Sequence, residues 1–210
     1  MIKYIIVDFG MGNLHSVKNA FEFLGKQVEI SSDPETVAKA QAIILPGVGA
    51  FPDAAEALKS KGLFELLRDK ALNQKVPFLG ICLGMQLLLT KSYEFRECEG
   101  LSLIDGTCEK IQAGDLKIPH IGWNSLSFEN KNSPLLCGLK EGDYVYFVHS
   151  FAAKLKDKTN LTAATFYGQQ IPGIIEKDNI FGCQFHPEKS EKVGLKILDN
   201  FCDYCAGKIK

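Results

Sequence analysis

The first half of the chain alternates between short apolar runs and longer segments in which apolar residues recur every three or four positions. The short runs lie at 2–7, 27–30, 42–45 and 76–81. The run at 2–7 is nearly continuous, as expected of a strand buried on both faces of a parallel sheet. Helical spacing follows at 17–24 and again at 53–73, with an interruption near Gly62. This alternation predicts an open, doubly wound α/β sheet with helices on both faces.

The second half follows a different pattern, in which strand-like runs are separated by Gly, Pro, Asn and Asp. These runs lie at 107–111, 144–148, 161–167, 173–176 and 180–185. The pattern is typical of antiparallel strands, so we expect a mixed sheet with antiparallel additions in the C-terminal half. The polar and aromatic residues at 119–124 interrupt this pattern, so we expect a loop there that carries the only tryptophan. Such a loop either fills the core or forms an interaction surface. A final amphipathic helix follows, with its apolar positions at 193–201 and a frayed end from 206, and we predict one domain, 1–210.

Charge and composition exclude several classes of function. A formal net charge of −1 gives no electrostatic case for binding nucleic acid or an anionic membrane. No apolar run approaches the roughly 20 residues that span a bilayer, and the first residues predict a strand rather than a signal peptide. Seven cysteines, an odd number, favour reduced thiols and a cytoplasmic protein. Cys202 and Cys205 have redox or zinc spacing, but they lie in a predicted helix without a second pair, which favours packing.

The segment Gly80-Ile81-Cys82-Leu83-Gly84 joins the fourth apolar run to an amphipathic run at 85–89. A Gly-x-nucleophile-x-Gly sequence between a strand and a helix is a nucleophile elbow, because the glycines permit a turn that lifts the central side chain clear of the sheet. Here that side chain is the Cys82 thiol, at the positive end of a helix, where a thiolate is favoured. A buried structural cysteine at a strand end is the alternative interpretation.

Two glycine-containing turns follow other predicted strands. Pro46-Gly47-Val48-Gly49 follows the third strand, where a loop can aim unpaired backbone N–H groups at a ligand, although an ordinary turn also fits. In a doubly wound sheet this loop and Cys82 would lie at the same edge. Gly10 and Gly12 match only part of a dinucleotide-binding fingerprint, because His15 occupies the third glycine position. We therefore expect a tight strand-to-helix turn there.

A second set of titratable groups ends the last predicted strand. His186 precedes Pro187, which favours an extended backbone at the histidine. Residues i and i+2 of an extended segment point to the same side, so Glu188 would lie beside His186. A base and the carboxylate that orients it require this arrangement. A structural His–Glu pair is the alternative, and His149, after the run at 144–148, is either a competing imidazole or a polar core residue.

Three of these segments occur in an order that resembles a known enzyme family. The segments are 46–49, 80–86 and 184–188. Together they resemble the triad-type (class I) glutamine amidotransferases. Longer stretches resemble, within that family, the glutaminase subunits of imidazole glycerol phosphate synthase. Those stretches are 8–14, 46–51, 119–124, 146–150 and 186–190. The resemblance spans nearly the whole chain, and residues 95–100 depart from the glycine-rich sequence usual in the family.

The resemblance implies a catalytic triad. Cys82, as a thiolate, would attack the side-chain carboxamide of glutamine, His186 would transfer protons, and Glu188 would orient His186. Backbone N–H groups would hold the developing oxyanion, and these come from Leu83 and from the loop of Gly47, Val48 and Gly49. We expect neither a metal nor a cofactor.

The resemblance also implies substrate and partner contacts. Gln86, Glu94 and backbone groups around Ser150 and Phe151 would bind the amino-acid end of glutamine. Ammonia would pass to a (β/α)₈-barrel cyclase subunit in a heterodimer, which makes imidazole glycerol phosphate and an aminoimidazole carboxamide ribonucleotide in histidine biosynthesis. The residues that match this interface are Asn13, Trp123, Tyr146 and Lys189.

Other functions share parts of this pattern. The chain could donate ammonia to a different synthase, for anthranilate, purine, pyridoxal phosphate or surface-sugar amidation. It could also be a non-catalytic scaffold subunit that has kept the fold, although Cys82, His186 and Glu188 are all present. A thiol esterase or peptidase would require a hydrophobic acyl pocket, which the residues around Cys82 do not indicate.

Overall fold

The apolar runs of the first half form the parallel side of one large sheet. In the computed structural model, which describes residues 2–209, these strands are β1 (Tyr4–Val7), β2 (Val28–Ser31), β3 (Ala42–Gly47) and β4 (Phe78–Cys82). They lie in the order β2-β1-β3-β4, and each neighbouring pair is parallel. The connecting helices are α1 (Leu14–Phe23), α2 (Pro34–Ala38), α3 (Phe51–Ser60) and α4 (Phe64–Leu72). As predicted, the interruption between α3 and α4 lies at Gly62, whose φ is +69°.

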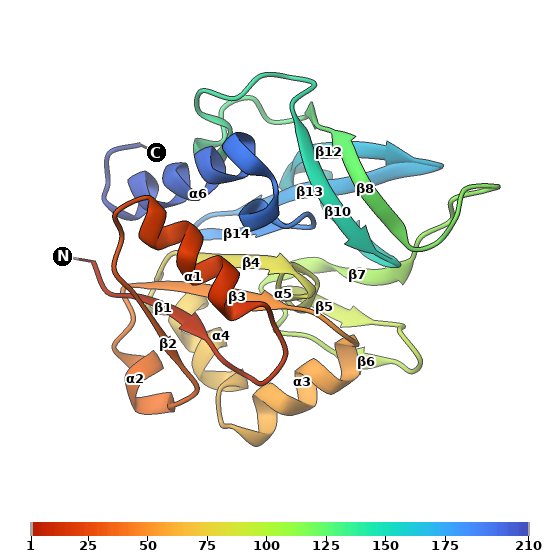
Figure 1. Cartoon of the computed structure of the whole chain (residues 1–210). Coiled ribbons are helices and arrows are strands. Elements are labelled where there is room, and N and C mark those ends of the chain that lie inside the picture. Colours follow the sequence, from red (N-terminus) through yellow and green to blue (C-terminus); the bar gives the residue numbers. More distant parts are fainter. Residues whose placement is uncertain (1, 210) are drawn as a thin grey trace.

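Two hydrophobic cores lie on opposite faces of this sheet. One core packs α3 and α4 against the sheet, and the other packs α1 and the C-terminal helix α6 (Glu191–Cys205) against it. Figure 1 shows the same division, with α1 in front of β1 and β3 and α6 above β14, whereas α2, α3 and α4 lie on the lower side. Val17, Ala20 and Phe21 of α1 are buried, as their spacing predicts. The doubly wound prediction is therefore confirmed.

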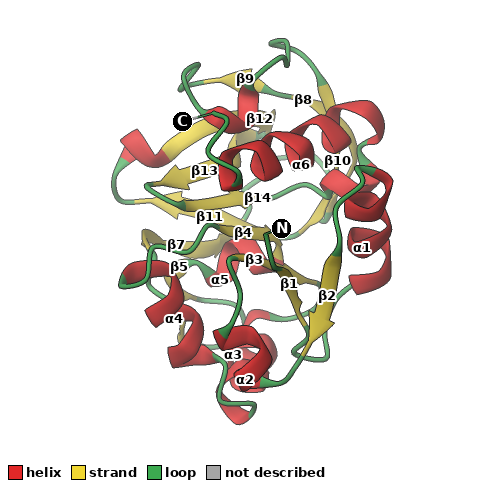
Figure 2. Cartoon of the chain, turned by 90° about the vertical axis from the view of Figure 1, so that its left-hand side faces the viewer, coloured by secondary structure: helices red, strands yellow, loops and turns green. Residues whose placement is uncertain are grey.

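The second half extends this sheet with antiparallel strands. β14 (Ile180–Cys183) lies parallel to β4, and three antiparallel strands follow it to complete an eight-stranded mixed sheet. Those strands are β13 (Gln169–Lys177), β12 (Leu161–Tyr167) and β9 (Ser127–Phe128). Figure 2 shows the strands of the large sheet running between the layers of helices. The predicted antiparallel additions are therefore present.

Two smaller sheets cover the edge of the large sheet where its parallel strands end. One has the order β11-β7-β5-β6, and the other pairs β8 with β10. Their bounds are β5 (Leu89–Ser92), β6 (Cys98–Glu99), β7 (Ile104–Lys110), β8 (His120–Ser125), β10 (Tyr144–His149) and β11 (Phe151–Leu155). Three single-turn 3₁₀ helices complete the chain, at Pro134–Leu136, Lys158–Asn160 and Pro187–Lys189.

Two local expectations are wrong. Residues 119–124 do not form a loop, because His120–Ser125 is strand β8, paired residue by residue with β10. The run at 85–89 is not amphipathic either. Helix α5 (Leu83–Leu87) is a short, fully buried helix, and residues 83–89 are all buried. Both errors arise where packing against other elements, rather than local periodicity, determines which side chains are covered.

Candidate active site

Cys82 lies on a sharp elbow between β4 and α5. It has φ +55° and ψ −111°, a backbone conformation that residues other than glycine rarely adopt. The glycines on either side make this turn possible. A Cβ added to Gly80 would lie 2.6 Å from the Gly84 carbonyl oxygen, and one added to Gly84 would lie 1.6 Å from that of Leu45. The close packing of the elbow against β3 therefore holds the strained conformation in place.

His186 and Glu188 form the second part of the site. His186 follows β14, and its Nδ1 lies 2.8 Å from Glu188 Oε1, with both side chains almost fully buried. The predicted pairing is present, but its predicted cause is only half right. His186 itself is extended, whereas Pro187–Lys189 forms a 3₁₀ turn. The turn, rather than a continuous extended segment, brings the carboxylate to the imidazole.

The environment of His186 strongly favours its protonated form. Burial alone lowers the pKa of the imidazole, but the nearby Cys82 thiol and Glu188 carboxylate more than offset burial and raise this pKa to about 10. The other ring nitrogen, Nε2, is buried and makes no hydrogen bond to any residue within 2–209. His186 is therefore held by the carboxylate at Nδ1 and leaves Nε2 free for the thiol and a substrate.

This arrangement predicts an unusual titration of His186. Because its pKa lies above the ordinary value of 6.5, the imidazolium persists as the pH rises past 6.5 and loses its proton only at considerably higher pH. Glu188→Gln removes the negative charge and is expected to lower the pKa of His186 by at least about one unit. NMR titration of the His186 ring carbons measures both values. A wild-type pKa near 6.5, or one unchanged by Glu188→Gln, would contradict this electrostatic account.

A cavity of about 240 Å³ brings the predicted site residues together at the carboxyl ends of β3 and β4. It is lined by Val48, Gly49, Cys82, Leu83, Gln86, Glu94, Val148, His149, Ser150, Phe151 and His186. Gly47 lies beside it, paired with Cys82 across β3 and β4, and Glu188 stands behind His186. Segments more than 100 residues apart in the sequence therefore meet around the Cys82 thiol.

The backbone near Cys82 can present N–H donors to a ligand. Leu83 is the first residue of α5, and the N–H groups of a first helical turn have no partner within the helix. Across the cavity, Val48 is exposed and Gly49 has φ +104°, a conformation suited to glycine. Such donors are those that stabilise an oxyanion during acyl transfer.

Polar side chains also line the cavity. The Gln86 amide donates to the Phe151 carbonyl at 3.0 Å and to Gln184 Oε1 at 3.1 Å. Glu94 Oε2 accepts a hydrogen bond from the Phe51 N–H at 2.8 Å. Gln86 is thus fixed by its neighbours, and the Glu94 carboxylate is anchored at the cavity wall, where it could meet a substrate ammonium group.

Two further buried side chains, Gln184 and His149, make contacts at the site. The Gln184 amide donates to the Cys82 sulfur at 3.9 Å, and Gln184 itself is fully buried. His149, the competing imidazole, lines the cavity, but its ring nitrogens contact the Phe151 carbonyl and His120. His186 rather than His149 therefore has a nitrogen free toward the thiol. Gln184 belongs to one of the family-like segments, which is the one signal that could have indicated it.

The four residues matched to a partner interface lie outside the cavity but close to one another. Trp123 and Tyr146 contact edge to face, with ring centroids 6.0 Å apart. The Tyr146 carbonyl accepts a hydrogen bond from the His186 N–H. His186 directly precedes the 3₁₀ turn that contains Lys189. That turn also contacts α1, which begins directly after Asn13. Asn13, Trp123 and Lys189 are exposed, so the four residues share a surface beside the site.

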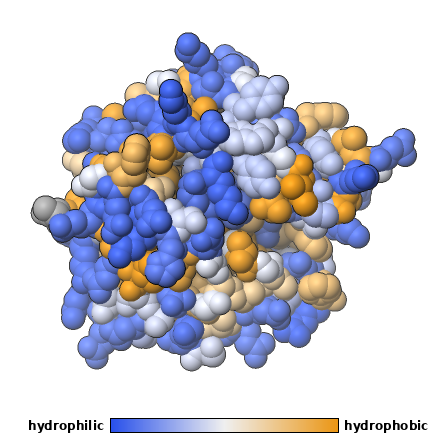
Figure 3. Space-filling model, in the orientation of Figure 1, coloured by the Kyte–Doolittle hydropathy of each residue, from blue (hydrophilic) through white to orange (hydrophobic). Residues whose placement is uncertain are grey.

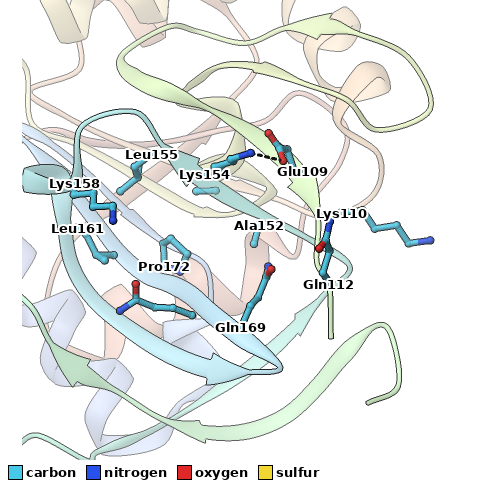
Figure 4. Close-up of a pocket in the computed structure, with 12 residues that line it drawn as sticks. Glu109, Lys110, Gln112, Ala152, Lys154, Leu155, Lys158, Leu161, Gln169 and Pro172 are labelled. Carbon is cyan, nitrogen blue, oxygen red and sulfur yellow. Dashed lines mark hydrogen bonds and ion pairs between the residues drawn. The ribbon is translucent and has the colours of Figure 1, made fainter. Parts of the chain in front are cut away.

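A second hollow, of about 330 Å³, lies between β7, β11 and β13 (Figure 4). Its polar groups are surface lysines and glutamines, and Lys154 pairs with Glu109 at 3.2 Å. None of the predicted site residues lines it. Among residues 2–209, no cluster of His, Cys, Asp and Glu is arranged to hold a metal, and no helix is both long and apolar enough to span a membrane.

Comparison with known proteins identifies the family of the whole chain. Residues 5–204 match the family described as glutamine amidotransferase class-I. The protein named imidazole glycerol phosphate synthase subunit HisH from Caldanaerobacter subterraneus subsp. tengcongensis is 51% identical over 196 residues, which cover 93% of this chain and 95% of that protein. The protein of the same name from Lactococcus lactis subsp. lactis is 48% identical over 204 residues, covering 97% and 99% of the two chains.

Solved structures share the fold at low sequence identity. PurLQS from Thermotoga maritima has a TM-score of 0.75 at 22% identity, covering 97% of this chain and 98% of that one. The glutaminase domain of CTPS from Trypanosoma brucei, with bound acivicin, has a TM-score of 0.71 at 16% identity, covering 100% and 96%. The match over 5–204 and the identities near 50% over nearly full length show that this chain belongs to the class I glutamine amidotransferase family, among its HisH subunits.

Proposed function

We propose that this chain hydrolyses glutamine to glutamate and ammonia, and that it delivers the ammonia to a cyclase subunit that makes imidazole glycerol phosphate in histidine biosynthesis. The observation that carries the proposal is the meeting of Cys82, His186 and Glu188 at one cavity, with Leu83 and the 47–49 loop beside the thiol. Relatives near 50% identity are named as subunits of imidazole glycerol phosphate synthase, which supports this choice among amidotransferase reactions.

In the first half-reaction, the Cys82 thiolate forms a bond to the glutamine carboxamide carbon. Backbone N–H groups of Leu83 and the 47–49 loop hold the oxyanion that develops, and loss of one such donor typically slows a reaction about 100- to 1000-fold. The carbon–nitrogen bond then breaks, and the His186 imidazolium gives its proton to the leaving ammonia. A glutamyl thioester remains on Cys82.

In the second half-reaction, water hydrolyses the thioester. His186, now neutral, removes a proton from the attacking water, and glutamate leaves as the carbon–sulfur bond breaks. The sulfur departs as a thiolate, and His186 retains the proton as the imidazolium, which Glu188 stabilises at Nδ1. The site returns to the ion pair with which it began.

Three further contacts complete the proposed substrate site. Glu94 binds the α-ammonium group of glutamine, since it places a carboxylate in the cavity wall. Gln86 and the backbone of Ser150 and Phe151, which also line the cavity, bind the amino-acid end as well. A cavity of about 240 Å³ suits a ligand of amino-acid size.

We place the cyclase partner on the surface formed by β8, β10 and the 3₁₀ turn at Pro187–Lys189. This surface carries Trp123, Tyr146, Asn13 and Lys189, and exposed Ile121, Tyr144 and Phe166 extend it. Figure 3 shows pale and orange residues interspersed over β8 and β10, whereas much of this face is blue. A (β/α)₈-barrel subunit seated there would receive ammonia beside the cavity. The seven free cysteines support a reducing, cytoplasmic location for the pair.

The partner is expected to control the glutaminase rate. Gly47 and Gly49 flank Val48 at the cavity, and glycines allow a peptide to reorient at low cost. We therefore expect slow glutamine hydrolysis by the chain alone and at least about a 100-fold increase with the cyclase subunit and its ribonucleotide ligand, equivalent to placing one oxyanion donor. Glutamate release measured with and without partner and ligand tests this. Equal turnover in all samples would overturn the gating, and no turnover in any sample would overturn the proposed function.

A further inference from the structure

His149 and His120 form a buried hydrogen-bonded pair that the proposed reaction does not use. His149 ends β10 and lines the cavity, and its Nε2 lies 3.0 Å from Nδ1 of His120 on β8. The His120 ring stacks on Phe147 and Tyr167, with centroids 4.8 and 4.0 Å away. Both histidines are buried. The two residues are cross-strand partners in the two-stranded sheet, so the pair joins β10 and β8 beside the cavity through rings whose orientation is fixed by packing.

The carbonyl at one end of the pair sets the direction of every hydrogen bond in it. The Phe151 carbonyl oxygen can only accept, so His149 Nδ1, 2.8 Å away, carries the proton and donates. Burial, together with the nearby His120 and His186, lowers the pKa of His149 to about 4, so its Nε2 is an acceptor. His120 Nδ1 therefore donates to it, and His120 Nε2 accepts from the Asn124 amide at 3.4 Å. Both imidazoles carry their proton on Nδ1.

The Phe151 carbonyl determines how the backbone faces the cavity. It accepts from both Gln86 and His149, while the Ser150 carbonyl is bound by the Ile111 N–H at 3.0 Å. In a β-strand the N–H and C=O of one residue point to the same side. The Ser150–Phe151 peptide is planar and trans, so the bond from Ile111 to its carbonyl aims its Phe151 N–H away from β7. The bonds from Gln86 and His149 hold the Phe151 carbonyl of the next peptide to that same side, where the cavity lies.

We infer that His149 and His120 are positioning residues for the amino-acid end of glutamine, because they fix the Phe151 peptide that faces it. The inference rests on the proposed function, since it assigns the pair to the substrate of that reaction. The pair does not transfer protons to the reacting atoms. It acts through the Phe151 backbone, so its loss weakens glutamine binding while leaving the chemistry at Cys82 intact.

The test compares steady-state kinetics of the complex with its cyclase partner. His149→Phe removes both hydrogen bonds of His149, and we expect KM for glutamine to rise about tenfold or more, with kcat within about threefold. His120→Phe keeps a ring between its stacking partners but loses one bond, and we expect a rise of about two- to tenfold. The double variant should be no worse than His149→Phe alone, because both changes act on one contact.

The matched control is Tyr167→Phe. It removes the hydrogen bond from the Tyr167 hydroxyl to the Lys117 carbonyl but keeps the ring that stacks on His120. Its KM should stay within twofold of wild type. Ammonia-dependent synthesis should be unchanged in every variant. A KM unaffected by His149→Phe, or an equal loss of kcat and of ammonia-dependent rate, would overturn the positioning role.

A second measurement determines the tautomers of His149 and His120 in the wild-type chain without its partner. It needs no variant, so it applies even if a variant fails to fold. Nitrogen-15 NMR of wild type should show both His149 and His120 as the Nδ1–H tautomer. An Nε2–H tautomer at either residue would contradict the hydrogen-bond direction and overturn the inference. A wild-type complex without glutaminase activity would instead remove the proposed function, and the tautomers would still report on the pair.

Discussion

Cys82→Ala is expected to reduce glutamine-dependent synthesis by at least about 10⁴-fold in the complex with the cyclase subunit, because no other group can form the thioester. Ammonia-dependent synthesis should continue at the wild-type rate, since that reaction needs only the partner's site. The two rates are measured on the same sample, with glutamine or with an ammonium salt as the nitrogen source. The predicted result is a loss that is confined to glutamine.

The glutamine-dependent and ammonia-dependent rates of Cys82→Ala together also distinguish a catalytic subunit from a scaffold subunit. A non-catalytic scaffold subunit predicts that neither rate changes in Cys82→Ala, since the alanine leaves the fold and the partner surface intact. A variant that fails to assemble with its partner would lose both rates together. Only a nucleophile at Cys82 predicts the loss of one rate and the retention of the other.

Gly84→Ala is expected to lower the free energy of unfolding by about 4 kcal/mol or more. The new Cβ would lie 1.6 Å from the Leu45 carbonyl oxygen, a backbone atom that cannot move without displacing β3. The elbow and the strand would separate, so glutaminase activity should be lost together with stability. Urea or thermal unfolding, followed by circular dichroism, measures the change.

Gly62→Ala is the matched control for this prediction. Gly62 has φ +69°, but its added Cβ would meet nothing nearer than Pro34 Cγ, at 3.9 Å. Gly62→Ala should therefore lower the free energy of unfolding only by the cost of placing alanine in a left-handed backbone conformation, about 1–2 kcal/mol. If the two variants were equally destabilised, steric closeness of the elbow to β3 could not be the cause.

Most of the parallel half of the fold could be predicted from the sequence because three of its four strands, β1, β3 and β4, are fully buried. Residues of β1 and β3 are all buried, so each strand is a nearly unbroken apolar run. Strand β8 gave no such signal. Its buried residue is His120, while Ile121 and Trp123 are exposed, so its pattern of polar and apolar residues resembles that of a loop.

Several short strands were missed for a related reason. β5, β6, β9 and β11 have two to five residues each, and β9 and β11 pair with strands that are distant in the sequence. β11, for example, pairs with β7, more than 40 residues earlier. Such pairing depends on contacts that local periodicity does not encode.

The same distinction between local and distant contacts applies to the candidate site. The elbow at Cys82 and the pairing of His186 with Glu188 follow from local spacing, and both are present in the structure. The contacts of Gln184 and His120 do not follow from spacing, because Gln184 meets Gln86 98 residues away and His120 meets His149 29 residues away. A single sequence contains no local pattern for a hydrogen bond between distant elements.

The most direct test of the central claim is the origin of the nitrogen in the product. The complex is supplied with glutamine labelled with nitrogen-15 at its amide, in the presence of unlabelled ammonium, and the imidazole glycerol phosphate is analysed by mass spectrometry. The account predicts nitrogen-15 in most of the product made by wild type and none in that made by Cys82→Ala. Unlabelled product from the wild-type complex, with no glutamate released, would contradict it.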